Sequence, residues 1–309
     1  MRAWVVTANG GPEVLELRDE PAPTPGADEL LVDVSVAGVN FRDIYERRGV
    51  YPIEPPVIAG IEGAGTVVEG ADEFSPGARV VWKSAQGSYA EQCVVPVAEA
   101  VPVPDGVADE VACAVLLQGM TAHYLTHSTY IVQPGDEVLV HAGAGGVGLL
   151  LTQLVKLRGG RVTATTSGGE KAELARQAGA DEVIGYDEVP EGKFAVVYDG
   201  VGKDTFERSL ASLKPRGVIA LYGAASGGVP EVQLSKLAAK SLFLTRPTLV
   251  HYTLTRDELL SRAHDVFGWV AAGKLDVRIG ARYPLDQARR AQEDLEARRT
   301  TGKLVLEVQ

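Results

Sequence analysis

The feature that most constrains this chain is a glycine-rich segment, Gly143-Ala-Gly-Gly-Val-Gly148, which matches the pattern G-x-G-x-x-G. It follows an apolar, β-branched stretch over residues 137–141 and opens an apolar stretch over residues 147–157. A strand, a tight glycine turn and a helix in this order are typical of dinucleotide-binding proteins. The alternative is an ordinary turn between a strand and a helix with no ligand, and the strand–turn–helix context favours the dinucleotide site.

Each glycine of this segment has an expected task. We expect Gly143 to allow the tight turn and Gly145 to let backbone N–H groups approach a pyrophosphate. We expect Gly148 to let the helix pack closely on the strand, while the helix N-terminus adds a partial positive charge under the phosphates. The segment therefore predicts a pyrophosphate site.

The residues after the second strand indicate which dinucleotide binds. NAD sites usually carry an acidic residue there, about 20 residues beyond the glycines, whereas this strand ends in Ala164-Thr-Thr-Ser167. Lys171 follows at the start of the next helix, and hydroxyls with an ammonium suit a 2′-phosphate. The pattern favours NADP(H). The alternative for Lys171 is a solvated helix lysine beside Glu170.

The pattern of apolar segments predicts a chain of two domains. From about residue 118 short apolar strands alternate with helices, which predicts a doubly wound parallel sheet. The expected strands are 138–141, 161–165, 182–184, 194–198, 218–221 and 242–244, and the expected helices are 147–157, 170–178, 205–213 and 234–240.

The first 115 or so residues instead show short β segments between Gly- and Pro-rich turns, which predicts a β-barrel. These segments are 1–7, 30–36, 64–68, 79–82 and 89–95. A capping box at Thr255-Arg-Asp-Glu258 predicts a helix that ends at Gly273. A helix over 286–298 and a strand over 303–308 follow. We expect that strand to complete the first domain, giving domains 1–117 with 252–309, and 118–251.

Charge and cysteine content exclude several classes of partner. The 30 basic and 41 acidic residues give a net charge of −11 and a pI near 5.0, which argues against nucleic-acid binding. Two cysteines, Cys93 and Cys113, build no disulfide framework and fit a reducing, cytoplasmic compartment. No apolar run approaches the roughly 18 residues of a membrane span, so no membrane interaction is expected.

Over nearly its full length, the chain resembles the zinc-free quinone oxidoreductase (zeta-crystallin-like) branch of the medium-chain dehydrogenase/reductase superfamily. The segments that carry the resemblance are Asn40–Pro52, Leu116–Tyr124, Val138–Gly148 and Phe243–Thr248. The resemblance implies an α/β fold: a GroES-like β-barrel domain plus a doubly wound Rossmann domain with a parallel six-stranded sheet. It also implies NADPH as the cofactor, an active site in the interdomain cleft and a homodimer.

The resemblance also implies roles for individual residues. Asn40 and Tyr51 are the candidate catalytic residues, and Asp43, Tyr45 and Gln118 are expected to face the substrate. Asp43 is alternatively a helix cap or an ion-pair partner, and the two tyrosines are alternatively ordinary rim packing. The implied cofactor-binding residues are Asn40, Thr121, Gly143, Ala144, Gly145, Gly146, Val147, Thr166, Ser167, Lys171, Tyr186, Gly223, Phe243 and Thr245, with Tyr186 near the 2′-phosphate.

The implied reaction is the NADPH-dependent, metal-free reduction of quinones or related α,β-unsaturated carbonyls, by hydride transfer or by one-electron steps. The alternatives are an enoyl-thioester or enal reductase of the same fold, and a non-catalytic NADPH-binding protein of crystallin or sensor type. The last strand of the parallel sheet, near residues 242–245, is expected at its edge. Pairing of this edge across a two-fold axis would form the homodimer, unless the loop 246–252 covers it.

The zinc-ligand positions of related alcohol dehydrogenases match Asn40, Ile61 and Gln118, and none of these is a good zinc ligand. His123 and His127 lie four residues apart without a third ligand nearby, which favours a packing role. We therefore predict that the purified protein carries no stoichiometric zinc and that its activity survives a strong chelator. One equivalent of tightly held zinc per chain in elemental analysis would contradict this prediction.

Overall fold

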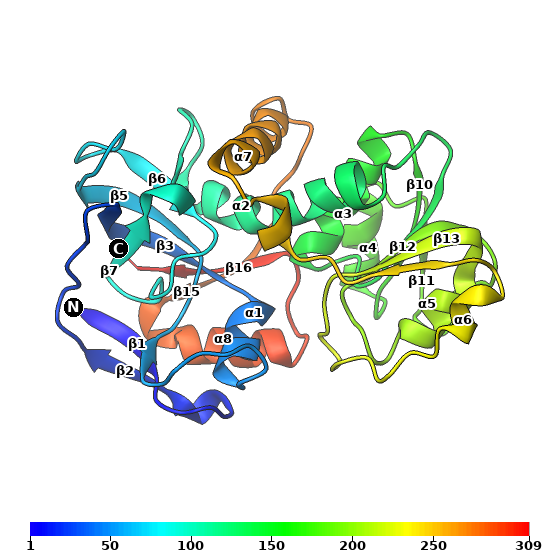
Figure 1. Ribbon diagram of the computed structural model, residues 1–309, viewed down its shortest axis with the longest axis horizontal. Coiled ribbons are helices and arrows are strands. Elements are labelled where there is room, and N and C mark those ends of the chain that lie inside the picture. Colours follow the sequence, from blue (N-terminus) through cyan, green and yellow to red (C-terminus); the bar gives the residue numbers. More distant parts are fainter. Residues whose placement is uncertain (309) are drawn as a thin grey trace. The chain divides into compact units, whose positions relative to one another are not determined.

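The computed structural model describes residues 1–308, which form two compact units (Figure 1). The first unit contains Met1–Leu117, Thr255–Ala271 and the chain from Val277 onward. The second unit contains Gln118–Leu254 and Ala272–Asp276. The first unit is therefore discontinuous in sequence, whereas the second is built almost entirely from one stretch.

The first unit is mostly β-structure. Its larger sheet has the order β15-β16-β3-β5-β6-β8, with β7 also paired to β3, and a smaller sheet has the order β2-β1-β4. The bounds are β1 Arg2–Val6, β2 Leu15–Asp19, β3 Glu29–Val39, β4 Val57–Ile58, β5 Gly63–Glu69, β6 Arg79–Trp82, β7 Gln92–Pro96, β8 Val101–Pro102, β15 Ile279–Pro284 and β16 Lys303–Glu307. The sequence pattern predicted β1, β3, β5, β6 and β7, but not the short or largely exposed β2, β4, β8 and β15.

The C-terminal strand completes this sheet, as the sequence analysis predicted. Strand β16 pairs antiparallel with β3, so that Leu304 lies opposite Val39 and Leu306 opposite Ala37. On its other side β16 pairs parallel with β15. Residues separated by more than 260 positions are therefore neighbours in one sheet.

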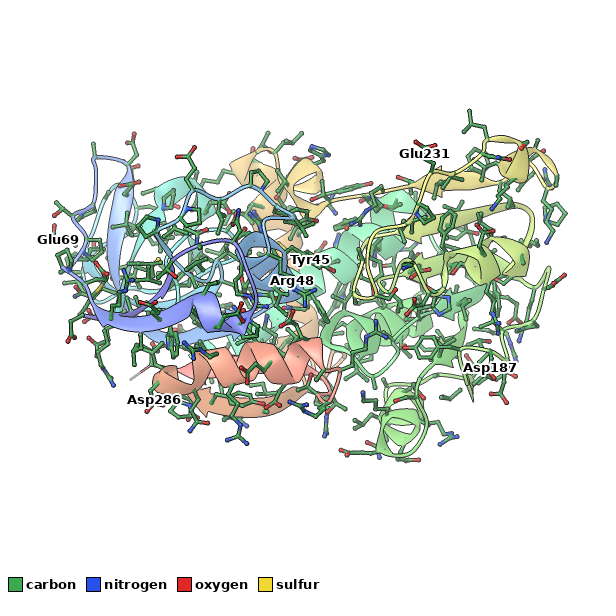
Figure 2. The ribbon with its side chains drawn as sticks, turned by 90° about the horizontal axis from the view of Figure 1, so that it is seen from below. Tyr45, Arg48, Glu69, Asp187, Glu231 and Asp286 are labelled. Carbon is green, nitrogen blue, oxygen red and sulfur yellow. The ribbon has the colours of Figure 1, made fainter. Side chains whose placement is uncertain are left out.

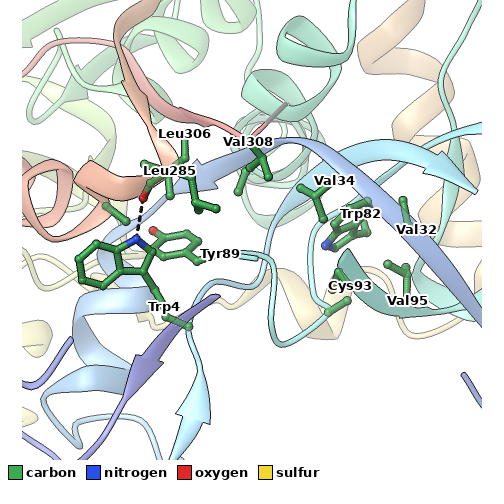
Figure 3. Packing of buried hydrophobic residues seen from close by; sticks show 14 of the residues in the cluster. Trp4, Val32, Val34, Trp82, Tyr89, Cys93, Val95, Leu285, Leu306 and Val308 are labelled. Atoms are coloured by element: carbon green, nitrogen blue, oxygen red, sulfur yellow. Dashed lines mark hydrogen bonds between the residues drawn. The ribbon is translucent and has the colours of Figure 1, made fainter. Parts of the chain in front are cut away.

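One hydrophobic core lies between the strands of both sheets of this unit (Figure 3). Trp4 of β1 donates its indole N–H to the carbonyl of Leu285 at 2.6 Å. Trp82 of β6 donates its indole N–H to the hydroxyl of Ser88 at 2.8 Å. Each large ring is thereby buried with its polar group satisfied, which fixes its position in the core. Both cysteines are buried and unpaired by disulfide.

The second unit contains a six-stranded parallel sheet with the order β11-β10-β9-β12-β13-β14. Counted along the chain, this is the order 3-2-1-4-5-6 of dinucleotide-binding sheets. The strands are β9 Glu137–Val140, β10 Arg161–Thr165, β11 Glu182–Ile184, β12 Phe194–Asp199, β13 Leu213–Leu221 and β14 Phe243–Thr245, with helices α3 Gly146–Leu157, α4 Glu170–Gln177, α5 Phe206–Ser212 and α6 Ser235–Ala238. The predicted parallel sheet is confirmed. Successive strands are added on one side of β9 up to β11 and then, from β12 onward, on its other side, so the strand order switches between β9 and β12.

Four further helices are α1 Phe41–Arg47, α2 Asp109–Tyr124, α7 Arg256–Ala271 and α8 Ala288–Glu296. Helix α1 lies within the segment 40–52, where the sequence analysis predicted no helix. Asp43 in the first turn of α1 accepts the backbone N–H of Asn40 at 2.8 Å, an N-terminal cap that starts the helix. Among residues 1–308, no helix is long and apolar enough to cross a membrane.

Candidate functional site

In the glycine turn between β9 and α3, the residue with a positive φ is an alanine and not a glycine. Ala142 adopts the left-handed conformation, with φ 53°, whereas Gly143 and Gly145 do not. The N–H of Gly143 donates to the carbonyl of Thr165 at 2.9 Å, and the N–H of Gly145 donates to the carbonyl of Ala142 at 2.9 Å. The left-handed residue of the turn is therefore Ala142, and Gly143 contributes to the tight turn by its missing side chain and not by a positive φ.

Two glycines of the turn, Gly143 and Gly148, are required because any side chain there would collide with other atoms of the protein. A Cβ atom at Gly143 would lie 2.7 Å from the Cβ of Ala164, and one at Gly148 would overlap the carbonyl oxygen of Ala142. At Gly145 the nearest atom to a Cβ is the same carbonyl oxygen, at 3.3 Å. Gly145 thus presents bare backbone on a side that the protein leaves almost open, as expected where a ligand approaches.

The backbone donors of the turn are the first N–H groups of α3. Gly145 is the N-cap, and helix geometry leaves the N–H groups of Gly146 and Val147 without acceptors inside the helix. These groups and the helix dipole together attract an anion. At the neighbouring strand ends, a Cβ at Gly223 would overlap the carbonyl oxygen of Gly200, so the loops after β12 and β13 are in close backbone contact.

A pocket of about 720 Å³ lies beside the ends of β10 and β11. Its walls are the turn after β10, one face of α4, and β11 with the turn that follows it. The lining residues are Thr166, Ser167, Gly168, Gly169, Ala172, Arg176, Val183, Ile184, Gly185, Tyr186, Asp187 and Glu188. Three of the predicted cofactor residues, Thr166, Ser167 and Tyr186, are thereby brought together.

Two features of this pocket differ from the expectation. Lys171 lies on α4 but is not among the residues that line the pocket, whereas Arg176 is. Ala172 and Arg176 are four residues apart and share one face of α4, which the sequence analysis did not consider. The four-residue spacing of Ala172 and Arg176 is the only sequence signal that would have placed Arg176 on the same face of α4 as Ala172.

Beneath the glycine turn lies a buried polar network. His141 contacts the hydroxyl of Thr165 through Nδ1 at 2.8 Å and that of Ser209 through Nε2 at 2.9 Å. Ser209 donates its proton to Asp199 at 2.8 Å, so its oxygen must accept from His141 Nε2–H. Nδ1 then accepts from Thr165, and burial lowers the pKa of His141, which favours this neutral tautomer.

Asp199 joins this network to the loop after β12. One oxygen of Asp199 accepts the backbone N–H groups of Val201 at 2.9 Å and Gly202 at 3.0 Å. The hydroxyl of Thr205 donates to the same carboxylate. Because the serine of this set donates to the aspartate instead of to the histidine, the three residues form a structural link and not a nucleophile with its base.

In the first unit, Asn40 is held by two charged side chains. Its carboxamide oxygen accepts from the ammonium of Lys303 at 2.8 Å, and its NH₂ group donates to Glu62 at 2.9 Å and to the carbonyl of Gly38 at 3.3 Å. Lys303 and Glu62 form a fully buried ion pair. An ammonium has no acceptor, so Lys303 fixes which way the amide points. Both donor hydrogens of Asn40 thus lie on protein acceptors.

Asp43 is buried beside this cluster. The hydroxyl of Tyr89 donates to its Oδ2 at 2.8 Å, and the N–H of Asn40 donates to the same atom. Desolvation and the nearby Glu46 raise the pKa of Asp43 from 3.8 to about 7, although the Tyr89 and Asn40 donors and Lys303 oppose the shift. The structure therefore gives Asp43 the helix-capping contact that was one of its two predicted roles, and leaves substrate contact untested.

The two predicted tyrosines lie at the end of α1. The rings of Tyr45 and Tyr51 are 5.5 Å apart and nearly perpendicular, and Phe41 lies 6.1 Å from Tyr45. The backbone N–H of Tyr51 donates to the carbonyl of Tyr45 at 3.2 Å. Figure 2 labels Tyr45, which lies on this helix, and Arg48, the residue that caps its C-terminal end. Tyr51 is exposed, so an aromatic surface is available at this edge of the first unit.

The remaining predicted residues lie on α2, β5 and β14. Gln118 and Thr121 are buried on α2, and Ile61, which precedes β5, is buried as well. Phe243 is 60% exposed on β14, where Thr245 is half-buried. The rings of His123 and His127 stack at 4.6 Å. Within residues 1–308, no group of three or more His, Cys, Asp or Glu side chains is arranged to hold a metal ion.

Fold and glycine turn define a dinucleotide-binding protein of the Rossmann type with a second, β-rich unit. Residues 26–105 match the family model of the alcohol dehydrogenase GroES-like domain, and residues 178–306 match that of the zinc-binding dehydrogenases. The chain is 44% identical to a quinone oxidoreductase of Pseudomonas aeruginosa, over 97% of each chain. It is 37% identical to a 2-haloacrylate reductase of a Burkholderia species, over 98% of each chain.

A solved structure of a mycobacterial protein complexed with NADPH is 48% identical, with a TM-score of 0.97 and full coverage of both chains. The chain belongs to the quinone oxidoreductase branch of the medium-chain dehydrogenase/reductase superfamily. Its fold is α/β, with a GroES-like β-barrel domain and a doubly wound Rossmann domain, as predicted.

The raised pKa of Asp43 gives a direct test of this cluster. In a ¹³C titration, one aspartate carboxyl carbon should change near pH 7, and this resonance should be missing in Asp43→Asn. Because the folded-state pKa is raised, wild type should lose stability relative to Asp43→Asn as the pH rises from about 4 to about 7. Tyr89→Phe removes a donor to the carboxylate and should move the titration to higher pH. Titration of every aspartate below pH 5 would contradict the assignment.

Proposed function

We propose that this protein is an NADPH-dependent reductase of quinones or related α,β-unsaturated carbonyls. Two neighbouring features carry the proposal: the glycine turn without side chains, and the pocket beside it. In this pocket the residues that follow β10, Thr166 and Ser167, carry hydroxyls and no carboxylate. The relatives named quinone oxidoreductase and 2-haloacrylate reductase, and the NADPH complex of the mycobacterial neighbour, support it.

The second unit fits the proposed cofactor. We place the pyrophosphate on the N–H groups of Gly146 and Val147, over the bare backbone of Gly145. Bound NADPH would supply a hydride at its nicotinamide ring. The other residues proposed to surround the cofactor are Asn40, Thr121, Gly143, Ala144, Thr166, Ser167, Lys171, Tyr186, Gly223, Phe243 and Thr245.

The first unit supplies most of the proposed substrate contacts. Tyr51 and Tyr45 present aromatic rings on which a planar acceptor can stack, and their hydroxyls can donate to its oxygen. Asn40 and Tyr51 are the proposed catalytic residues. Asp43 and Tyr45 are proposed to face the substrate, as is Gln118, which belongs to the second unit. The proton that completes the reduction comes from solvent or from a tyrosine hydroxyl.

We propose that the reaction needs no metal. The positions that match zinc ligands carry a carboxamide at Asn40, a buried alkyl chain at Ile61 and a carboxamide at Gln118. The two charged groups next to Asn40, the ammonium of Lys303 and the carboxylate of Glu62, form an ion pair with each other, so together they carry no net charge that would attract a cation. The proposed division into domains 1–117 with 252–309 and 118–251, and a cytoplasmic location, stay predictions.

An electron-poor alkene is a second candidate substrate, favoured by the likeness to 2-haloacrylate reductase. Enals and enoyl thioesters belong to this class. Quinones and enones both accept a hydride at an electron-poor carbon or oxygen, so one site geometry serves both. A non-catalytic NADPH-binding role is the alternative outside the enzymes.

The test of this function is NADPH oxidation, followed at 340 nm, with a panel of small quinones, enals, haloacrylates and enoyl thioesters. We expect turnover with quinones in the wild type. Gly145→Val should weaken NADPH and NADH alike, by about tenfold or more, because its side chain occupies the space of the pyrophosphate. Tight NADPH binding without turnover on any acceptor would show a binding protein instead of a reductase.

Gly148→Ala is the matched comparison for Gly145→Val. Its Cβ would overlap the carbonyl oxygen of Ala142, so this variant should lower thermal stability before any ligand is added. A Cβ at Gly145 lies 3.3 Å from the same oxygen, a much milder contact than the overlap at Gly148, so Gly145→Val should keep more of its stability than Gly148→Ala. A Gly145→Val protein that is unfolded, or that binds both cofactors normally, would contradict the placement of the pyrophosphate.

We further propose a homodimer through strand β14. In the part of the chain that the structure describes, β14 is the edge of the parallel sheet, and Phe243 on it is 60% exposed. An unpaired apolar edge tends to pair with another strand, and pairing across a two-fold axis extends the sheet. Light scattering at micromolar concentration should therefore give twice the 32.7 kDa chain mass.

Phe243→Lys should convert this dimer to a monomer, because it places a charge on the edge. Leu17→Lys, at an exposed apolar position on β2 of the first unit, is the control and should leave the dimer intact. A monomeric mass for wild type would contradict the proposal.

A further inference from the structure

The pocket beside β10 and β11 contains a cation to which no role has been assigned. We propose that Arg176 binds the 2′-phosphate of NADPH and determines the preference for NADPH over NADH. This inference rests on the proposed function, because it concerns the adenosine end of the proposed cofactor. It adds a specificity-determining residue that the sequence pattern did not indicate.

The position of Arg176 carries the inference. Arg176 and Ala172 line the pocket from the same face of α4, while Thr166, Ser167 and Tyr186 line it from the strand ends. The pocket follows the second and third strands of the dinucleotide-binding sheet, where the adenosine ribose lies in such folds. An arginine at this place accommodates a 2′-phosphate in NADP-binding members of the fold.

The charges around the pocket make this cation necessary. Asp187 and Glu188 also line it, so the lining residues carry one positive and two negative side chains. Asp187, labelled in Figure 2, lies in the turn after β11. One Glu188 oxygen accepts the N–H of Gly185 at 2.6 Å, which keeps that carboxylate at the pocket. Two carboxylates repel a phosphate dianion, and Arg176 is the lining residue that offsets them.

The side chain of Arg176 is available for this task. Its ion pair with Glu173 on α4 is long, 3.6 Å, and both side chains are more than half exposed. Such a pair is weak and screened by salt. A guanidinium offers two parallel N–H donors to a phosphate, which is stronger and more directional than a single ammonium contact. Thr166 and Ser167 place hydroxyls in the same pocket.

The experiment compares ligands that differ only in the 2′-phosphate. Dissociation constants are measured for NADPH against NADH, and for 2′,5′-ADP against 5′-AMP, with wild type, Arg176→Met and Lys171→Met. A lost charge-assisted bond corresponds to a loss of about 10- to 150-fold. We expect that loss in Arg176→Met for NADPH and 2′,5′-ADP, a smaller one in Lys171→Met, and changes within about twofold for NADH and 5′-AMP.

A second variant tests the opposite direction. Asp187→Asn removes a negative charge from the pocket and should strengthen NADPH and 2′,5′-ADP while leaving 5′-AMP unchanged. Glu231→Gln, a charge removal at a position that does not line the pocket, is its control and should change none of the four constants. Arg176→Lys should bind 2′,5′-ADP with intermediate affinity, because it keeps the charge but not the paired donors.

The outcomes separate this inference from the proposed function. If Arg176→Met weakens all four ligands equally, or weakens none, or if Lys171→Met alone shows the selective loss, Arg176 does not bind the 2′-phosphate. If wild type binds 2′,5′-ADP through Arg176 but does not oxidise NADPH with any acceptor of the panel, the inference holds and the proposed reductase activity fails.

Discussion

A buried ammonium–carboxylate pair holds the first unit together. Lys303 on β16 and Glu62 before β5 are withdrawn from solvent, and each would be strongly unfavourable there without the other. Removing one partner of such a pair typically costs about 3–5 kcal/mol. The second oxygen of Glu62 also accepts the N–H of Leu117 in α2 at 3.3 Å. One ion pair thus joins the C-terminal strand, the central sheet and the start of α1 through Asn40.

Space for that pair is created by a glycine. A Cβ at Gly38 would overlap the Glu62 carboxylate and would lie 2.9 Å from the ammonium of Lys303. The second unit uses the same arrangement: missing side chains at Gly143 and Gly148 let the turn close, and the His141–Ser209–Asp199 network fixes the loops around it. In both units, absent side chains and hydrogen-bonded buried polar groups position the loops.

The sequence predicted the parallel sheet well, because its strands are short apolar runs and most of them are separated by helices of recognisable period. It also predicted that β16 joins the first unit, because residues 303–308 form a short apolar run that follows the last predicted helix. It did not predict α2, whose sequence DEVACAVLLQGMTAHY is apolar on nearly every side and so lacks the alternation of a surface helix. Helix α1 was missed because its start depends on Asp43 and on a buried network that forms only in the folded state.

At the site, the pattern located the glycine turn but did not indicate that Ala142 takes the left-handed conformation, with φ 53°, because an alanine rarely adopts it. It named Lys171 as the phosphate cation because lysine came first after the strand. Which residues of α4 line the pocket depends on how the helix is rotated against β11. That rotation is a tertiary property, and it placed Arg176 in the pocket.

The pairing of β16 with β3 also sets the order in which a growing chain can reach its final form. The parallel sheet of the second unit is contiguous, so all its strands exist once residue 245 has been made. Strand β3, by contrast, gains its neighbour β16 only when the residues from Lys303 onward have been made, and Glu62 gains its counter-charge at the same point. Until residues 303–307 are synthesised, β3 has no neighbour on the side of β16, and Glu62 has no counter-charge from Lys303. The first unit can therefore be completed only after every strand of the second unit's sheet has been made, although β1 and β3 precede that sheet in the sequence.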